Sequence, residues 1–308
     1  TPLPAPAPPT PLPAPTPPQP QPSPPEPLPP EPLPPTPTPV VPTPTPPVAP
    51  VPAPTPPQPA PLPQGPKAGE PHTLKLGIEL AWIPSGQFIM GSPTNEPQRI
   101  NHEGPQHEVV LAKGFWMGKT EVTTAQWNLL LPETPRLGPD RIPVHTVSWP
   151  EAVQFCNALN SKEGALHPGY EVRLPTEAEW EYACRAGSSH AYSFGPSSQN
   201  LANHSWYGRN AGSVPHPVGV QSSNRFDLHD MHGNVREWCH DRYADTYPNT
   251  PQLDPAGPPA GDLRVTRGGS WQLFESYCRS AARKPERPTT HSKDLGFRIV
   301  VAPAISNK

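Results

Sequence analysis

The segment most informative about the fold lies near the C-terminal end: Arg264-Val265-Thr266-Arg267-Gly268-Gly269-Ser270-Trp271. Two further segments follow it, Cys278-Arg279-Ser280-Ala281-Ala282-Arg283 and Leu295-Gly296-Phe297-Arg298-Ile299. Arginine occurs in all three, and glycine and an aromatic residue occur in the first and the last; we expect these residues to hold a rigid frame. The residues between them, 272–277 and 284–294, have a mixed composition that suits exposed loops. We call these the first and the second open run.

Composition divides the chain into two parts. More than half of its 58 prolines precede Lys67, whereas all eight tryptophans follow that residue. Proline fixes φ and removes a backbone donor, so residues 1–70 are predicted to be a disordered, Pro-rich spacer close to polyproline II. The PxxP motifs in this spacer could also serve as a docking site for a proline-binding domain. Residues 71–308 are predicted to form one domain, large enough to bury a core.

Charge and cysteine usage narrow the class of protein. The net charge is −3, which gives no reason to expect nucleic acid as a partner. No apolar run is long enough to span a bilayer. The four cysteines lack metal-type CxxC spacing, and we expect buried thiols. Because the sequence starts with Thr1 rather than methionine, we expect an upstream segment, which could be a signal or a lipid anchor.

The domain contains both helix and strand signals. Four strands are predicted, at residues 76–82, 86–90, 107–112 and 115–119. A turn at 84–86 is expected to join the first two, and the last two are expected to form a second hairpin. Thr123 is expected to cap a short helix to Leu131, and capping boxes open helices at 148–160 and 176–186. After Gly187 we expect long loops pinned by short strands. These elements favour an α+β fold over a doubly wound sheet.

Several ordered motifs now add up to a family resemblance. They are Phe88-Ile89-Met90-Gly91-Ser92, Lys119-Thr120-Glu121-Val122-Thr123, Val147-Ser148-Trp149-Pro150-Glu151-Ala152, Phe155-Cys156-Asn157, Arg173-Leu174-Pro175-Thr176-Glu177-Ala178-Glu179-Trp180-Glu181-Tyr182-Ala183, Met231-His232-Gly233-Asn234-Val235-Arg236-Glu237-Trp238, Arg267-Gly268-Gly269-Ser270-Trp271 and Gly296-Phe297-Arg298. The chain, from about Leu76 to Val301, resembles the formylglycine-generating enzyme and sulfatase-modifying-factor family. The resemblance implies a C-type-lectin-like fold with two helices, a short twisted sheet and long loops.

The same resemblance argues against the family's best-known chemistry. Formylglycine-generating members oxidise a sulfatase cysteine with copper and oxygen, and the resemblance implies two thiolates after the Gly-Gly-Ser motif, because soft thiolates hold Cu(I). The first of these positions falls on Leu273. The second falls on Cys278 if no gap is opened, whereas a shorter loop makes Cys278 a scaffold residue. We therefore expect a non-catalytic protein that requires no cofactor, with a sulfatase-modifying-type oxidoreductase or another enzyme of the family as the alternative.

The composition of the open runs suggests a binding role. Their variable-looking positions hold residues that an AAC asparagine codon reaches when its adenines are replaced: Leu273, Phe274, Ser276, Tyr277, Thr289, Thr290, His291, Ser292 and Asp294. Gln272, Glu275, Lys284, Glu286 and Lys293 do not fit that codon. The pattern is similar to the variable proteins of diversity-generating retroelements, in which the C-terminal segment (here 264–301) forms the ligand-binding face. Ordinary drift in a silent family member is the competing explanation, and a near-identical DNA repeat that differs only at adenines would decide between them.

This resemblance implies an extracellular or cell-surface display protein, phage-encoded in some cases. Its ligand would be a protein or glycan on a cell or phage surface. Aromatic anchors among small polar groups suit such a surface.

A calcium site is also implied by the family. Its ligands would be the side chains of Asp230 and Glu237 and the backbone carbonyls of Gly233 and Val235, all hard oxygen donors. The alternative is that Asp230 and Glu237 form hydrogen bonds or an ion pair with Arg236 or Arg298.

Overall fold

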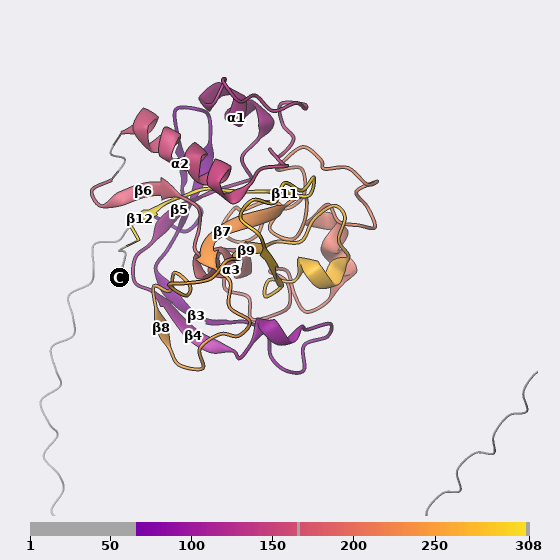
Figure 1. Ribbon diagram of the computed structural model, residues 1–308. Coiled ribbons are helices and arrows are strands. Elements are labelled where there is room, and N and C mark those ends of the chain that lie inside the picture. Colours follow the sequence, from indigo (N-terminus) through magenta and orange to yellow (C-terminus); the bar gives the residue numbers. More distant parts are fainter. Residues whose placement is uncertain (1–65, 165–166, 306–308) are drawn as a thin grey trace, which may run out of the picture. The chain divides into compact units, whose positions relative to one another are not determined.

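A computed structural model describes residues 66–164 and 167–305. The predicted spacer, residues 1–70, lies almost entirely outside these described residues. The described chain is an α+β fold with three sheets (Figure 1). Its α-helices are α1 (Thr124–Leu130), α2 (Trp149–Glu163) and α3 (Glu177–Arg185). Three 3-10 turns add η1 (Asn101–Glu103), η2 (Ser198–Asn203) and η3 (Glu275–Cys278). No helix in these ranges has the length and apolar character needed to cross a membrane.

The largest sheet has five strands in the order β1-β2-β5-β12-β6. They are β1 (Pro71–Thr73), β2 (Glu79–Ile83), β5 (Phe115–Gly118), β6 (Tyr170–Arg173) and β12 (Val300–Pro303). All of their pairings are antiparallel. The C-terminal strand β12 therefore lies between elements from the first half of the domain.

Two smaller sheets complete the frame. One has the order β10-β9-β7-β11 and contains β7 (Arg236–Arg242), β9 (Arg264–Arg267), β10 (Arg283–Glu286) and β11 (Leu295–Gly296). The other has the order β3-β4-β8 and contains β3 (Gly86–Met90), β4 (His107–Leu111) and β8 (Gln252–Leu253). Helix α3 contacts β3, β7 and β9, so it joins both small sheets.

The predicted strand positions are close to those observed, but two predicted pairings are wrong. Strand β3 pairs with β4, and β2 pairs with β5, so the segments expected to form hairpins belong to different sheets. The chain changes sheet at Pro84-Ser85 and again at Gly114, where the backbone passes against Trp82 too closely for a Cβ. The first strand also starts later than predicted, because Gly77 (φ +69°) closes a turn in which Leu74 N–H donates to the Ile78 carbonyl at 3.0 Å.

Capping explains where the helices begin. The Thr123 hydroxyl accepts from Gln126 N–H at 3.3 Å, and that of Thr176 accepts from Glu179 N–H at 3.1 Å. At Ser148, the Glu151 carboxylate accepts from the backbone N–H at 2.8 Å. These contacts satisfy donors that a helix start leaves free. The described residues contain three α-helices where the family resemblance implied two, and α1 is the short helix that Thr123 was predicted to cap.

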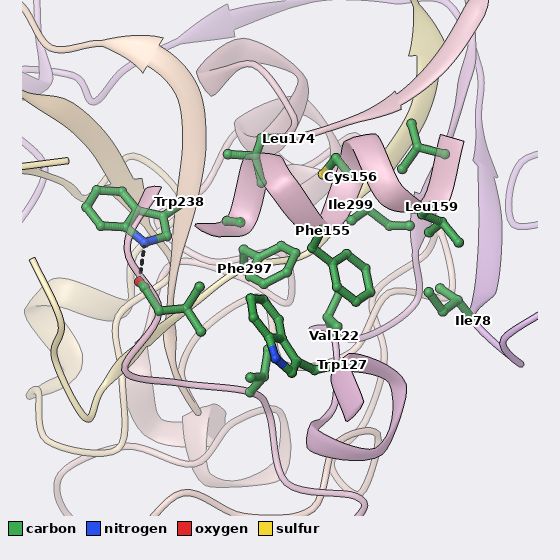
Figure 2. Close-up of a cluster of buried hydrophobic side chains, with 14 of the residues drawn as sticks. Ile78, Val122, Trp127, Phe155, Cys156, Leu159, Leu174, Trp238, Phe297 and Ile299 are labelled. Atoms are coloured by element: carbon green, nitrogen blue, oxygen red, sulfur yellow. Dashed lines mark hydrogen bonds between the residues drawn. The ribbon is translucent and has the colours of Figure 1, made fainter. Parts of the chain in front are cut away.

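An aromatic cluster fixes α1 and α2 against the five-stranded sheet (Figure 2). Trp127 of α1 stacks on Phe155 of α2 with centroids 5.6 Å apart, and Phe297 meets Phe155 edge-on at 5.4 Å. Trp238 of β7 closes one side and donates its Nε1–H to the Val147 carbonyl at 2.8 Å. All four rings are at most 1% exposed, so this cluster carries much of the apolar burial.

Replacing Phe155 by alanine should lower the free energy of unfolding by about 3–5 kcal/mol, because it empties a site lined by two other rings. Leu129→Ala, on a side chain that is 63% exposed, should change it by less than about 0.5 kcal/mol. Urea denaturation of both variants measures the difference. Equal effects would contradict the packing described here.

Candidate functional site

A glycine corner sets the start of the first open run. After Arg267 the chain turns through Gly268 (φ +96°) and Gly269 (φ +69°). A Cβ on Gly269 would lie 2.6 Å from Cys278 Sγ and 3.0 Å from Cys278 Cα. The missing side chain therefore allows η3, at the end of the run, to lie directly on the corner where the run begins.

The first open run exposes two aromatic rings on this base. Phe274 is 59% exposed and Tyr277 40%, whereas Leu273 and Ser276 are half-buried. Two hydrogen bonds hold the backbone at the start of this run. Leu273 N–H donates to the Ser270 carbonyl at 3.0 Å, and the Leu273 carbonyl accepts from Gly208 N–H at 2.8 Å. The run is thus an ordered turn with outward-facing side chains.

The second open run packs along the start of α2. Thr289 and His291 are exposed, and Thr290 and Ser292 are half-buried. Trp149 N–H donates to the Pro288 carbonyl at 2.9 Å, and His291 Nε2 lies 2.9 Å from a Glu151 carboxylate oxygen.

Asp294 departs from the prediction that it belongs to the exposed set. It is 4% exposed, and its carboxylate accepts two hydrogen bonds from Arg236, each 3.0 Å long, and one from Ser270. Burial raises the pKa of Asp294, but the hydrogen bonds and charge of Arg236 outweigh burial and bring the pKa to about 2. Asp294 is therefore part of the frame.

Arg236 binds residues near both ends of the second open run and so holds that run beside the first open run. Besides Asp294 it binds Glu286 at 3.1 Å, and Trp271 Nε1–H reaches the Lys293 carbonyl at 3.3 Å. Lys284, Leu273 and Tyr277 share the lining of one small hollow. The sequence prediction considered Arg236 as an ion-pair partner of Asp230 or Glu237, whereas its observed partners are Asp294 and Glu286.

The hollow has no groups suited to copper chemistry. Its volume is about 10 Å³, room for about one water molecule, and no cysteine or histidine is among the residues that line it. Cys278 is fully buried instead, in a cluster with Ala191, Tyr192 and Leu201. Burial raises the pKa of its thiol to about 12, so the thiolate that binds Cu(I) is scarce at neutral pH.

Comparison with known families explains this frame. A model of the sulfatase-modifying factor enzyme 1-like domain matches residues 69–303. The chain belongs to this family. The described fold, with its few helices and several sheets, is the C-type-lectin-like fold expected from the resemblance.

Three proteins similar to this chain carry different names. The formylglycine-generating enzyme of Streptomyces coelicolor is 32% identical over 274 residues, covering 70% of this chain and 87% of that protein. Variable protein 1 of Treponema denticola superposes with a TM-score of 0.65 at 29% identity, covering 76% of this chain and 99% of that one. PvdO of Pseudomonas aeruginosa gives 0.70 at 29% identity, covering 77% and 100%. The proteins that this chain resembles therefore include a named enzyme and a named variable protein.

The calcium ligands implied by the family fit only in part. Both oxygens of Glu237 are occupied by Arg298 at 2.6 and 2.7 Å, and one also accepts from Trp180 Nε1–H at 2.7 Å. This is the ion pair named as the alternative. Asp230, 1% exposed, accepts from Gly219 N–H with one oxygen, while its other oxygen has no hydrogen-bond partner among the described residues.

Glu121 is the residue at this place that sequence reasoning missed. It is fully buried, and its Oε2 has no hydrogen-bond partner within the described part of the chain. Burial raises the pKa of Glu121 well above its ordinary value, and the charges of Asp230 and Glu237 raise it further. Three carboxyl groups thus share one arginine, and a bound cation would relieve the excess negative charge. Calcium binding stays a prediction, with the free oxygens on Asp230 and Glu121.

Gly269→Ala should lower the free energy of unfolding by more than about 2 kcal/mol, because the new methyl group meets Cys278 and the positive φ adds about 1 kcal/mol. Gly212→Ala is the matched control, since Gly212 has a φ of +59° and open space around it. Thermal and urea denaturation compare the two. Equal losses would show that close packing on η3 contributes nothing.

Calcium should raise the melting temperature of the protein, and Asp230→Asn should abolish that rise, because the amide supplies no charge to the cation. Glu133→Gln, at an exposed position, is the control and should respond like wild type. Differential scanning fluorimetry with excess calcium or EDTA measures the effect. An unchanged wild-type melting temperature would reject the calcium prediction.

Proposed function

We propose that this protein is a non-catalytic ligand-binding display protein whose binding surface is formed by the two open runs. The observation that carries the proposal is the pair Phe274 and Tyr277. Of the eight large apolar side chains that are exposed in the described residues, these two are the aromatic ones. Aromatic anchors on an ordered base contribute strongly to binding because little side-chain freedom is lost.

The frame around the rings supports a surface that accepts varied side chains. Phe274, Tyr277, Thr289 and His291 project from backbone that buried contacts hold in place. Substitution there removes few internal contacts, so it costs little stability. Variable protein 1 of Treponema denticola has the same fold at 29% identity, which is consistent with this use of the frame.

The ligand we propose is a protein or glycan on a cell or phage surface. The polar residues of the second open run, Thr289, Thr290, His291 and Ser292, would supply hydrogen bonds beside the aromatic pair. Presentation outside the cell fits this role, and residues 1–70 would serve as the stalk.

The alternative function is formylglycine generation, favoured by the 32% identity to the Streptomyces coelicolor enzyme. The hollow next to Leu273 argues against it, since its lining has no thiol. Leucine cannot bind a metal, and the Cys278 thiol is buried and protonated.

Phe274→Ala combined with Tyr277→Ala should weaken ligand binding by about 30-fold or more, because the two rings together contribute about 2 kcal/mol or more to the binding free energy. The full chain would be screened on arrays of surface glycans and cell-surface proteins, followed by titration of the best ligand. Leu137→Ala combined with Leu253→Ala, at side chains that are 97% and 68% exposed, is the matched control and should bind normally.

The same protein should leave a cysteine-containing sulfatase peptide unchanged in the presence of copper and oxygen. Mass spectrometry would detect the aldehyde product. Formylglycine formation would overturn the proposal in favour of the enzyme. Binding that survives loss of both rings would move the site away from the first open run.

A further inference from the structure

An open cleft lies outside the candidate binding surface. Its volume is about 760 Å³, within the range of small-molecule sites. One wall is the loop after α3, residues 187–196, and the other is formed by His204 and residues 223–225. None of the lining residues belongs to the open runs, so neither the family chemistry nor the proposed surface uses this cleft.

The charge of the cleft favours an anionic ligand. Arg225 is exposed and forms no ion pair with any described residue. His190 is also exposed on the lining, which contains no aspartate or glutamate. A guanidinium without a carboxylate partner is suited to bind a carboxylate or phosphate through two parallel hydrogen bonds.

The lining also has groups that suit a hydroxylated ligand. Ser188, Ser189, Ser193 and Ser223 line the cleft. Ser193 is held by His232, whose Nε2 lies 2.8 Å from the Ser193 hydroxyl oxygen and 3.2 Å from the Ser193 nitrogen. The opposite ring nitrogen, Nδ1, lies 2.8 Å from the Cys278 carbonyl, which assigns the proton to Nδ1 and makes Nε2 the acceptor.

His232 therefore holds Ser193 in place on the lining of the cleft. The Ser193 hydroxyl donates its proton to this ring, and its lone pairs remain free to accept a hydrogen bond from a ligand hydroxyl.

An aromatic platform forms the third element of the cleft. Phe194 and His204 stack with centroids 4.3 Å apart and an interplanar angle of 8°, and Tyr192 stacks on Phe194 at 5.2 Å. Burial lowers the pKa of His204, so the end of the stack is uncharged. Flat uncharged rings pack well against the C–H face of a sugar ring.

We propose that this cleft binds an anionic sugar, a pyranose that carries a carboxylate or a phosphate. Arg225 holds the anionic group, Ser193 accepts a hydrogen bond from a ring hydroxyl, and the Phe194–His204 stack carries the apolar face. The inference does not depend on the proposed function of the open runs.

The test is titration calorimetry of the full chain with four probes: glucuronate, glucose 6-phosphate, glucose and inorganic phosphate. At least one of the two anionic sugars should bind about 10-fold more tightly than glucose and inorganic phosphate, since the charged hydrogen bond and the sugar contacts each contribute. The two anionic probes distinguish a carboxylate ligand from a phosphate ligand.

Three variants locate the site. Arg225→Gln should weaken that binding by about 10-fold or more, while Lys113→Gln, which removes an exposed positive charge that is not on the cleft lining, should leave it unchanged. The Phe274→Ala and Tyr277→Ala double variant should bind the sugar like wild type, so that failure of one proposal does not imply failure of the other.

Several results would overturn the inference. They are no heat from either anionic sugar at millimolar concentration, inorganic phosphate binding as tightly as the better of the two anionic sugars, and equal effects of Arg225→Gln and Lys113→Gln. Circular dichroism checks that each variant is folded.

Discussion

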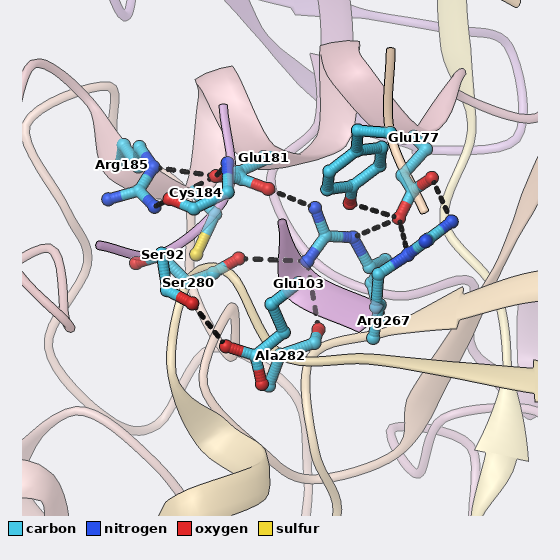
Figure 3. Close-up of polar contacts among 12 residues, drawn as sticks. Ser92, Glu103, Glu177, Glu181, Cys184, Arg185, Arg267, Ser280 and Ala282 are labelled. Carbon is cyan, nitrogen blue, oxygen red and sulfur yellow. Dashed lines mark hydrogen bonds and ion pairs between the residues drawn. The ribbon is translucent and has the colours of Figure 1, made fainter. Parts of the chain in front are cut away.

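A buried network of ion pairs joins α3 to β9 and β10 (Figure 3). Glu181 accepts from Arg185, from Arg267 and from Gly91 N–H, and Glu177 accepts twice from Arg283. Burial disfavours the charged form of each residue, but the opposite charges of its partners outweigh that cost. As a result, the pKa of Glu181 is lowered and the pKa of Arg267 is raised. Losing one partner of such a pair costs about 3–5 kcal/mol, because the other charge remains buried.

This network explains why the glycine corner has a fixed position. Arg267 is the last residue of β9, and its guanidinium also donates to the carbonyls of Ser280 and Ala282 at 3.0 and 2.8 Å. The backbone before the first open run and the backbone after η3 are thus tied to one side chain. Arg279 adds a second connection through Glu103 and Glu96, and the frame remains rigid while the open runs face solvent.

Local signals in the sequence predicted a large share of this fold. Capping boxes at Ser148 and Thr176 gave the helix starts, since they depend on residues three positions apart. The strand pairings were harder, because a chain that changes sheet at a short turn has the same local pattern as a hairpin. Trp82 and Gly114 meet only in the folded protein, and their close contact left no local signal.

The candidate site shows the same division. Exposure of Phe274 and Tyr277 followed from their place between scaffold motifs, whereas the burial of Asp294 depended on Arg236 of another strand. Glu121 was visible as part of a family motif, but its unpartnered oxygen beside Asp230 arises from tertiary packing. The composition could not indicate the cleft at Arg225 either, because its lining comes from three separate segments.

The contact between Gly269 and Cys278 has an evolutionary consequence. The loop that leaves the corner must return to the same corner, and Ser270 is anchored to Asp294. Its length is therefore constrained: an inserted or deleted residue would have to break the corner or the anchor. Exchanges of one side chain for another meet no such barrier. The geometry of this loop therefore accommodates changes of side chain more readily than changes of length.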